Sequence, residues 1–130
     1  MENVRIVKAR LSESTGWAYI KCLTPALRPV SDLERGVQQY MDELQVRAQT
    51  SEFLDLATAS KAANGCKILL SSLKADPSLQ RHRAVQGAVD YFILEEDAEA
   101  DDSIIGFDDD WEVVETTAAV LGVSLKEPGE

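Results

Sequence analysis

The chain has 130 residues, of which 45% are hydrophobic and 28% are charged, and its formal net charge at pH 7 is −10. This composition excludes wholesale disorder, and the length predicts a single domain over residues 1–130. The start lacks the apolar core of a signal peptide, and no apolar run approaches the roughly 20 residues that cross a bilayer. We therefore expect a soluble, cytoplasmic protein that makes no membrane contact.

The first 30 residues carry mixed signals. Val4, Val7 and Leu11 recur at helical spacing, whereas the stretches VRIV and WAYIKCL could equally be extended. Prolines at positions 25 and 29 end whatever precedes the next helix. We expect one or two short helices in this part of the chain.

A helix is predicted to begin at the segment SDLE, residues 31–34. This segment has the form of a capping box, in which the Ser31 hydroxyl accepts a hydrogen bond from the Glu34 backbone N–H and the Glu34 carboxylate reaches back. The apolar residues that follow at helical spacing are expected to be buried, and they are Leu33, Val37, Tyr40, Leu44 and Ala48.

The strongest periodic signal runs from Phe53 to Leu73, with apolar residues at steps of three and four. It predicts a helix of about six turns after a cap at Thr50 or Ser51, and we expect this helix to be the central one of the fold. Gly65 interrupts the stripe at a cost of about 1 kcal/mol relative to alanine, which indicates a kink or a close helix contact there.

Two more helices are predicted downstream. One begins near Pro77 and continues to Leu94, and the other follows GFDDD, with Trp111 on its apolar face and Gly122 at its C′ position. The fold class is therefore expected to be all-α, a single-domain bundle of four main helices plus a less defined N-terminal segment.

The charge is divided unequally along the chain. Residues 1–90 contain 12 Lys/Arg against 10 Asp/Glu, whereas residues 91–130 contain one against 13, so the two parts carry +2 and −12. A polyanion would be repelled by the last part, which argues against binding of nucleic acid or an anionic membrane. We expect the partner to be a protein with a basic surface, or a cation.

The acidic part places a helix end, two aspartates, a glycine and an aspartate pair in a fixed order, namely Tyr91, Asp97, Asp101, Gly106, and Asp109 with Asp110. This order resembles the signature of the YkvA-like family of bacterial domains of unknown function. That signature reads roughly Tyr-Leu, a Pro-x-Asp-x-Ile-Pro-Asp loop, and Gly-x-x-Asp-Asp leading into a helix. The chain departs from it at Glu95 and Ala100, where the family has prolines. The resemblance covers residues 91–115 and implies a small helical bacterial domain without an established activity.

The simplest interpretation of the acidic part is structural. Aspartates at a helix N-terminus accept hydrogen bonds from free N–H groups and meet the positive end of the helix dipole, each for about 0.5–2 kcal/mol. Asp108 or Asp109 would then be a cap, Gly106 would provide the turn ahead of it, and Phe107 would pack inward as a hydrophobic staple. Most other carboxylates would be solvated.

A metal site is one alternative, because a hard divalent cation relieves repulsion among crowded carboxylates. An EF-hand register beginning at Asp97 fails at position 6, where Asp102 replaces glycine, and at position 12, where the bidentate glutamate is missing. A carboxylate site built across helices stays open and would make the protein a Mg²⁺, Ca²⁺ or Mn²⁺ hydrolase. Its candidate ligands are Asp97, Asp101, Asp109 and Asp110.

A protein-binding surface is the interpretation that we prefer, because a concentrated negative patch steers a basic partner and raises its association rate by about 10 to 10³ fold. The expected surface comprises Glu95, Glu96, Asp97, Glu99, Asp101, Asp102, Asp108, Asp109, Asp110 and Glu112. The expected function is a non-enzymatic interaction module of the YkvA-like kind. An immunity protein, antitoxin or nucleic-acid mimic that inhibits a basic target is the alternative within this class.

Catalytic motifs are lacking in the sequence. His82 is the only histidine, and no GxSxG, GxGxxG, Walker or HExxH motif occurs, so we expect no cofactor and lean against an enzyme. Cys22 and Cys66 fit no zinc-ligand spacing and are interpreted as buried free thiols, and His82 as a hydrogen-bonded structural residue. Six aromatic residues are expected in the core, namely Trp17, Tyr19, Tyr40, Phe53, Phe92 and Trp111.

Overall fold

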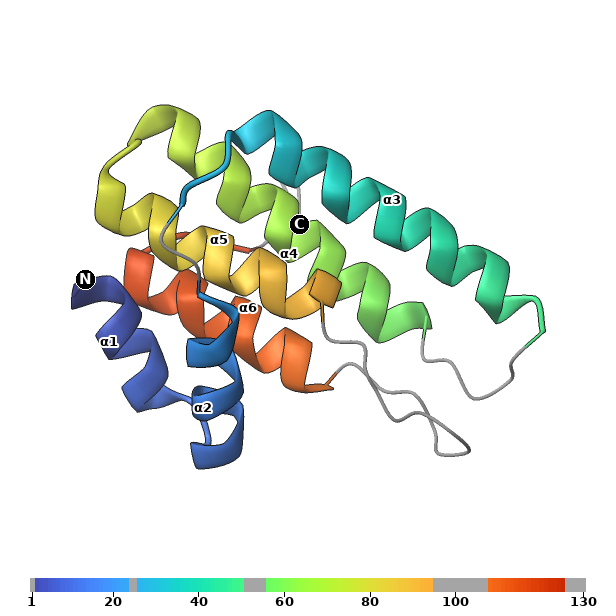
Figure 1. Ribbon diagram of the computed structural model, residues 1–130, viewed down its shortest axis with the longest axis horizontal. Helices are drawn as coiled ribbons and strands as arrows, with labels where there is room; N and C mark the ends of the chain where they lie inside the picture. The colour runs from blue at the N-terminus through green and yellow to red at the C-terminus, as the bar shows by residue number, and fades with distance from the viewer. Residues whose placement is uncertain (1, 24–25, 51–55, 95–107, 126–130) are drawn as a thin grey trace.

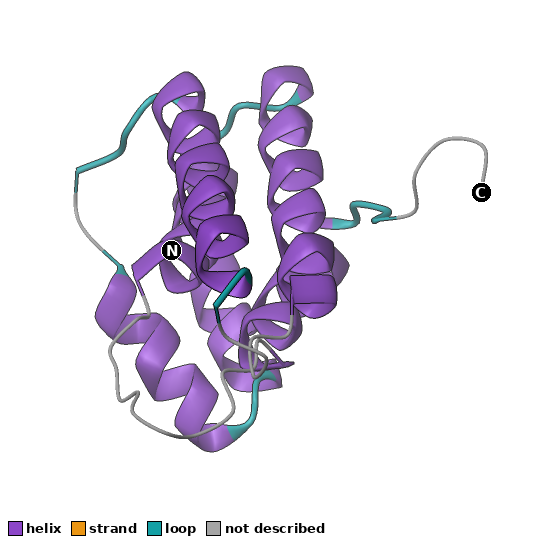
Figure 2. Ribbon diagram, turned by 90° about the vertical axis from the view of Figure 1, so that its right-hand side faces the viewer, coloured by secondary structure: helices purple, strands orange, loops and turns teal. Residues whose placement is uncertain are grey.

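The computed structural model describes residues 2–23, 26–50, 56–94 and 108–125, and these residues form helices and short connections without any strand (Figures 1 and 2). The helices are α1 (Glu2–Arg10), α2 (Glu13–Cys22), α3 (Val30–Ala48), α4 (Leu56–Ala75), α5 (Leu79–Leu94) and α6 (Asp108–Leu121). The all-α class is confirmed. The described residues contain six helices, so the count of four main helices is not confirmed. The first 22 residues form two of the six, which is within the expectation of one or two short helices there.

Helix α5 is the centre of the molecule. It contacts each of the other five helices, and every residue from 84 to 92 is buried. Figure 1 shows α3 and α4 on one side of α5 and α6, with α1 and α2 on the other. The prediction that the 53–73 stripe forms the central helix is therefore wrong, since α4 contacts only α3, α5 and α6 among the described helices. The apolar stripe of α4 occupies one face of that helix, whereas residues 84–92 of α5 are buried on every face of the helix.

One hydrophobic cluster draws side chains from all six helices. It includes Val7 of α1, Tyr19 of α2, Leu44 of α3, Leu70 of α4 and Val113 of α6, all fully buried. None of the described helices combines the length and the apolar character that crossing a bilayer requires.

The start of α3 differs from the predicted capping box. Pro29 is the N-cap, and its carbonyl oxygen accepts hydrogen bonds from the backbone N–H groups of Asp32 at 3.0 Å and Leu33 at 3.1 Å. Ser31 therefore lies inside the helix, and no side chain caps this end. The Glu34 carboxylate is instead 3.5 Å from the Lys74 ammonium of α4. Proline suits this position ahead of the first turn, because its φ of −60° is compatible with the helix that follows and it has no N–H that would need a partner.

The expectation that the aromatic residues fill the core holds for some of them. Tyr19 and Phe92 are fully buried, and Tyr40 is half-buried with its ring edge-on to Phe92 at 5.1 Å between centroids. Trp17 is 54% exposed, which contradicts the prediction for this residue. The Lys8 ammonium lies 4.2 Å from the Trp17 ring centroid and covers part of it. Phe53 lies outside the described residues.

Two glycines take the positions predicted for them, one at the contact between α4 and α6 and one at the end of α6. A Cβ atom placed on Gly65 would lie 2.4 Å from Cγ1 of Val114, so the predicted close helix contact at Gly65 is confirmed, and α4 continues through it. Gly122 has φ +73° and ends α6 in a Schellman motif, as its predicted C′ position requires. Its N–H binds the carbonyl of Ala119 at 3.3 Å, and the Val123 N–H binds that of Ala118 at 2.9 Å.

Candidate functional site

The acidic surface predicted from the sequence lies only partly within the described residues. Asp108 and Asp109 occupy the first turn of α6 and are exposed. Tyr91 is buried in α5, close to its C-terminal end. The residues outside the described ranges are Glu95, Glu96, Asp97, Glu99, Asp101, Asp102, Gly106 and Phe107.

Asp110 is not part of an exposed surface, because only 2% of it is accessible to solvent. Successive residues of an α-helix are about 100° apart around the axis, so Asp109 faces solvent while Asp110 faces the core. The buried neighbour of Asp110 is the Cys66 thiol of α4. Burial, and then the negative charge of Asp110, raise the pKa of the Cys66 thiol, which keeps this cysteine in the unreactive thiol form.

Glu112 connects α6 to the N-terminus of α2. Its carboxylate accepts a hydrogen bond from the Ser12 backbone N–H at 2.8 Å and a weaker one from the Ser12 hydroxyl at 3.4 Å. Ser12 is the N-cap of α2, and its own side chain does not cap the helix. Glu112 therefore contributes a capping interaction from a distant element, a role that its place in an acidic run does not reveal.

The metal interpretation receives no geometric support from the two ligand candidates that the structure describes. Asp109 is exposed and Asp110 is buried, so the two carboxylates do not face a common point. Asp97 and Asp101 lie outside the described residues. Within the described ranges, no three Asp, Glu, His or Cys side chains are grouped closely enough to hold a metal ion.

A polar stripe on α5 holds the connection between α2 and α3. Gln86 accepts a hydrogen bond from the Arg28 N–H at 2.8 Å and donates one to the Ala26 carbonyl at 3.0 Å. One turn earlier, Nε2 of His82 lies 2.7 Å from the Arg28 carbonyl oxygen, so the prediction of a hydrogen-bonded structural histidine is confirmed. One turn later, the Asp90 carboxylate pairs with the Arg28 guanidinium.

Asp90 contributes a buried carboxylate to this stripe. It is 2% exposed, whereas the Arg28 side chain is 46% exposed. Burial raises the pKa of the Asp90 carboxyl above its usual range, although the hydrogen bond and the charge of Arg28 act in the opposite direction. Residue type alone does not reveal this stripe, because glutamine and aspartate usually lie on the surface. The signal that could have revealed it is the spacing, since His82, Gln86 and Asp90 recur at steps of four.

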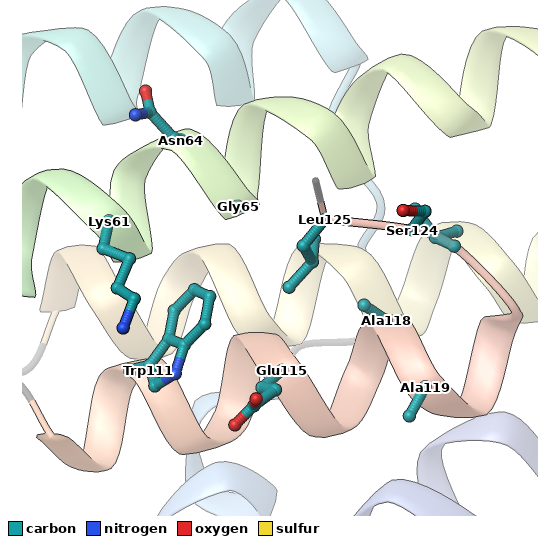
Figure 3. A pocket seen from close by; sticks show the side chains of 10 residues that line it. Lys61, Asn64, Gly65, Trp111, Glu115, Ala118, Ala119, Ser124 and Leu125 are labelled. Atoms are coloured by element: carbon teal, nitrogen blue, oxygen red, sulfur yellow. The ribbon is translucent and has the colours of Figure 1, made fainter. Parts of the chain in front are cut away.

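A groove of about 610 Å³ runs along α4 and α6 and is bordered by residues 123–125. Gly65 and Ala118 are among its small lining residues, and Figure 3 shows the Trp111 ring toward one end and the Leu125 side chain near the middle, directed between the two helices. The Lys61 ammonium of α4 lies 4.7 Å from the Trp111 ring centroid. Trp111, predicted as a structural residue, is half-buried and belongs both to the core and to this groove.

The two cysteines are both free, as predicted, although only Cys66 is fully buried and Cys22 is half-buried.

A scan with protein-family models gave no match for this chain, and searches of curated proteins and of solved structures found no similar protein.

Proposed function

We propose that the protein is a non-enzymatic interaction module of the bacterial cytoplasm, of the YkvA-like kind, which binds a protein with a basic surface. The observation that carries the proposal is the separation of charge, with −12 over residues 91–130 against +2 over residues 1–90. Electrostatic attraction of this kind accelerates association with a cationic partner.

The ion pairs within the fold support the proposal. The described residues contain four salt bridges, and the acidic partners in them are Asp32, Glu34, Asp76 and Asp90. Asp108, Asp109 and Glu115 are exposed on α6 and make no salt bridge with a described residue. Their charge is therefore not neutralised by a described lysine or arginine and can act on a partner.

The start of α6 is suited to contact a partner because it is a fixed element. Asp108 and Asp109 stand on the first turn of a helix whose inner face is anchored by Val113, Val114 and Leu121. Carboxylates held on a rigid helix lose little conformational freedom on binding, which favours affinity.

A capture experiment tests the proposed function. The tagged protein is incubated with bacterial lysate at low and at high salt, and the bound proteins are quantified by mass spectrometry. The test variant replaces four acidic residues by their amides, namely Asp97, Asp101, Asp108 and Asp109. The control variant makes the same change in net charge at exposed sites elsewhere, namely Glu13, Asp32, Asp42 and Glu43.

We expect basic proteins to bind at low salt, to be released at high salt, and to be lost with the test variant while the control variant keeps them. A set of bound proteins that is the same for both variants would refute the proposal.

A further inference from the structure

The groove between α4 and α6 is a second feature of the surface that the acidic run does not explain. It exists because the two helices approach closely at Gly65, where a Cβ atom would come within 2.4 Å of Val114 Cγ1 and 3.5 Å of the Trp111 ring. Ala118 and Ala119 on α6 are also short, so the wall of the groove beside Leu125 is formed by small side chains. Its volume of about 610 Å³ lies in the range of roughly 300–1,000 Å³ that is typical of binding pockets.

The two large apolar side chains of the groove are held in place by the fold. Leu125 is positioned by the Schellman motif at Gly122, which turns the chain back after α6, and Figure 3 shows its side chain directed between α4 and α6. The Lys61 ammonium lies 4.7 Å from the Trp111 ring centroid, and Leu125 lies on the other side of the indole. A groove that combines these two apolar side chains with small neighbouring residues suits one large apolar side chain of a partner.

The charges beside the groove indicate the chemistry that would accompany that side chain. Glu115 lines the groove, is exposed, and makes no salt bridge with a described residue. Asp108 and Asp109 continue the negative charge along the same helix, and α6 contains no basic residue. Among the described residues that line the groove, Lys61 is the one cation, and it is placed against the Trp111 ring. A partner segment with lysine or arginine beside its apolar residue therefore complements this wall.

We infer that the groove binds a short basic segment of the partner protein, with one large apolar side chain against Trp111 and Leu125 and a lysine or arginine beside Glu115. The inference rests on the proposed function, because it assigns the apolar part of the same interaction. Attraction by the acidic residues provides the association rate, and burial of the apolar side chain provides the specificity.

Three fluorescein-labelled peptides test the inference by fluorescence anisotropy. The first, Gly-Lys-Arg-Gly-Leu-Gly-Arg-Lys-Gly, carries both expected features. The second replaces its leucine by alanine, and the third replaces its four basic residues by glutamate. We expect the leucine peptide to bind about tenfold more tightly than the alanine peptide, since leucine buries more apolar surface than alanine in the groove. The acidic peptide should not bind.

Two pairs of protein variants locate the binding. Ala119→Trp fills the groove from an exposed position, and Ala57→Trp makes the same change at an exposed position of α4 that does not line the groove. Glu115→Gln removes the charge in the groove, and Glu43→Gln removes one at an exposed position of α3. We expect Ala119→Trp to weaken binding of the leucine peptide about tenfold and Glu115→Gln about threefold at low salt, while both controls bind normally.

The emission of Trp111 provides an independent readout. In a Trp17→Phe background, which removes the 54% exposed tryptophan, Trp111 is the only tryptophan left. Binding of the leucine peptide should shift the Trp111 emission to shorter wavelength, and binding of the alanine peptide should not. Circular dichroism of each variant confirms that it is folded before its affinity is compared.

Several results would overturn the inference, and they separate it from the proposed function. Equal affinity for the leucine and alanine peptides, or unchanged binding to Ala119→Trp, would show that the groove is not the docking site. If binding is then lost on removing the charges at Asp108 and Asp109, the acidic module stands and only the groove is refuted. Absence of binding by any basic peptide would refute both. Self-association that Ala119→Trp abolishes would show that the occupant is a second copy of the chain.

Discussion

Gly65 is the residue at which helix propensity and packing oppose each other most directly. Replacing it by alanine would gain about 1 kcal/mol of helix propensity, but the new Cβ would lie 2.4 Å from Val114 Cγ1. The branched Val114 side chain is fully buried and restricted at χ1, so relieving this clash requires neighbouring atoms to shift. We expect Gly65→Ala to lower the free energy of unfolding by about 1–3 kcal/mol, measured by urea denaturation.

Gly36 of α3 provides the matched control for Gly65→Ala. A Cβ atom there would meet only the terminal Cδ1 of Ile93, at 3.1 Å, and this side chain is half-buried and can adjust. Gly36→Ala should therefore be neutral or slightly stabilising, because the gain in helix propensity is kept. Equal stability of the two variants would contradict the packing argument.

Asp90 gives the stability of the protein a predictable dependence on pH. Burial raises the pKa of the Asp90 carboxyl in the folded state above its value of about 3.9 in an unfolded chain. Between these two pKa values the folded protein binds more protons than the unfolded chain, so this residue makes stability fall as the pH rises. The loss is complete once the pH exceeds the folded pKa.

We therefore expect Asp90→Asn to remove one component of the fall in stability above about pH 4, as seen in urea denaturation at a series of pH values. Asp42→Asn at an exposed position of α3 is the control and should leave the pH dependence unchanged. If Asp90→Asn steepened the fall instead, the Arg28 charge would outweigh burial and the sign of the argument would be wrong.

At the scale of the helices, Gln86 fixes the connection between α2 and α3 onto α5. Its side-chain amide makes hydrogen bonds of 2.8 Å and 3.0 Å to the backbone at Arg28 and Ala26, and Gln86 is only 2% exposed. Gln86→Ala would leave both backbone groups without these hydrogen bonds. We expect the variant to lose about 1–3 kcal/mol of stability and to show faster hydrogen exchange at the Arg28 amide.

Gln39→Ala on the exposed side of α3 is the control for this prediction and should change neither quantity. Loss of stability without faster exchange at Arg28 would indicate that Gln86 stabilises α5 alone rather than its contact with the connection.

The same helices show how far the sequence predicts the fold. Local signals were sufficient where the determinants lie within one helix: the stripe of α4, the glycine of the α4–α6 contact and the turn at Gly122 are all as expected. Local signals were insufficient where the partners of a residue lie far from it in the sequence. α5 appears polar at Gln86 and Asp90, and the partners that permit their burial lie 58–62 residues earlier in the chain. The N-cap of α3 was misplaced because Pro29 precedes a sequence that also fits a capping box.

The candidate site was predictable in part for the same reason. The exposed positions of Asp108 and Asp109 follow from an acidic first turn, which is a local pattern. The buried position of Asp110 and the capping of α2 by Glu112 depend on neighbours from α4 and from residue 12. The groove depends on the packing of α4 against α6 and on the turn after α6, so no short motif encodes it.

At the scale of the whole molecule, the uneven charge should make stability depend on salt. Residues 91–130 carry 13 Asp/Glu and one lysine, and Asp108, Asp109 and Glu115 make no salt bridge with a described residue. Their mutual repulsion opposes folding and is screened when the Debye length falls from about 30 Å at 0.01 M to about 8 Å at 0.15 M salt. We expect the Tm measured by circular dichroism to rise by about 2–5 °C over this range.

The location of the repulsion can be tested with the same measurement. Replacing Asp108 and Asp109 by asparagine should reduce the rise in Tm, whereas Asp42→Asn combined with Glu43→Gln, which changes the net charge equally, should preserve more of it. Equal reductions would mean that the molecule responds to its total charge and not to a concentrated field. This distinction matters for function, because the charge repulsion that destabilises the free protein is reduced when a cationic surface approaches it. A basic partner should therefore raise the Tm at low salt by more than it does at high salt.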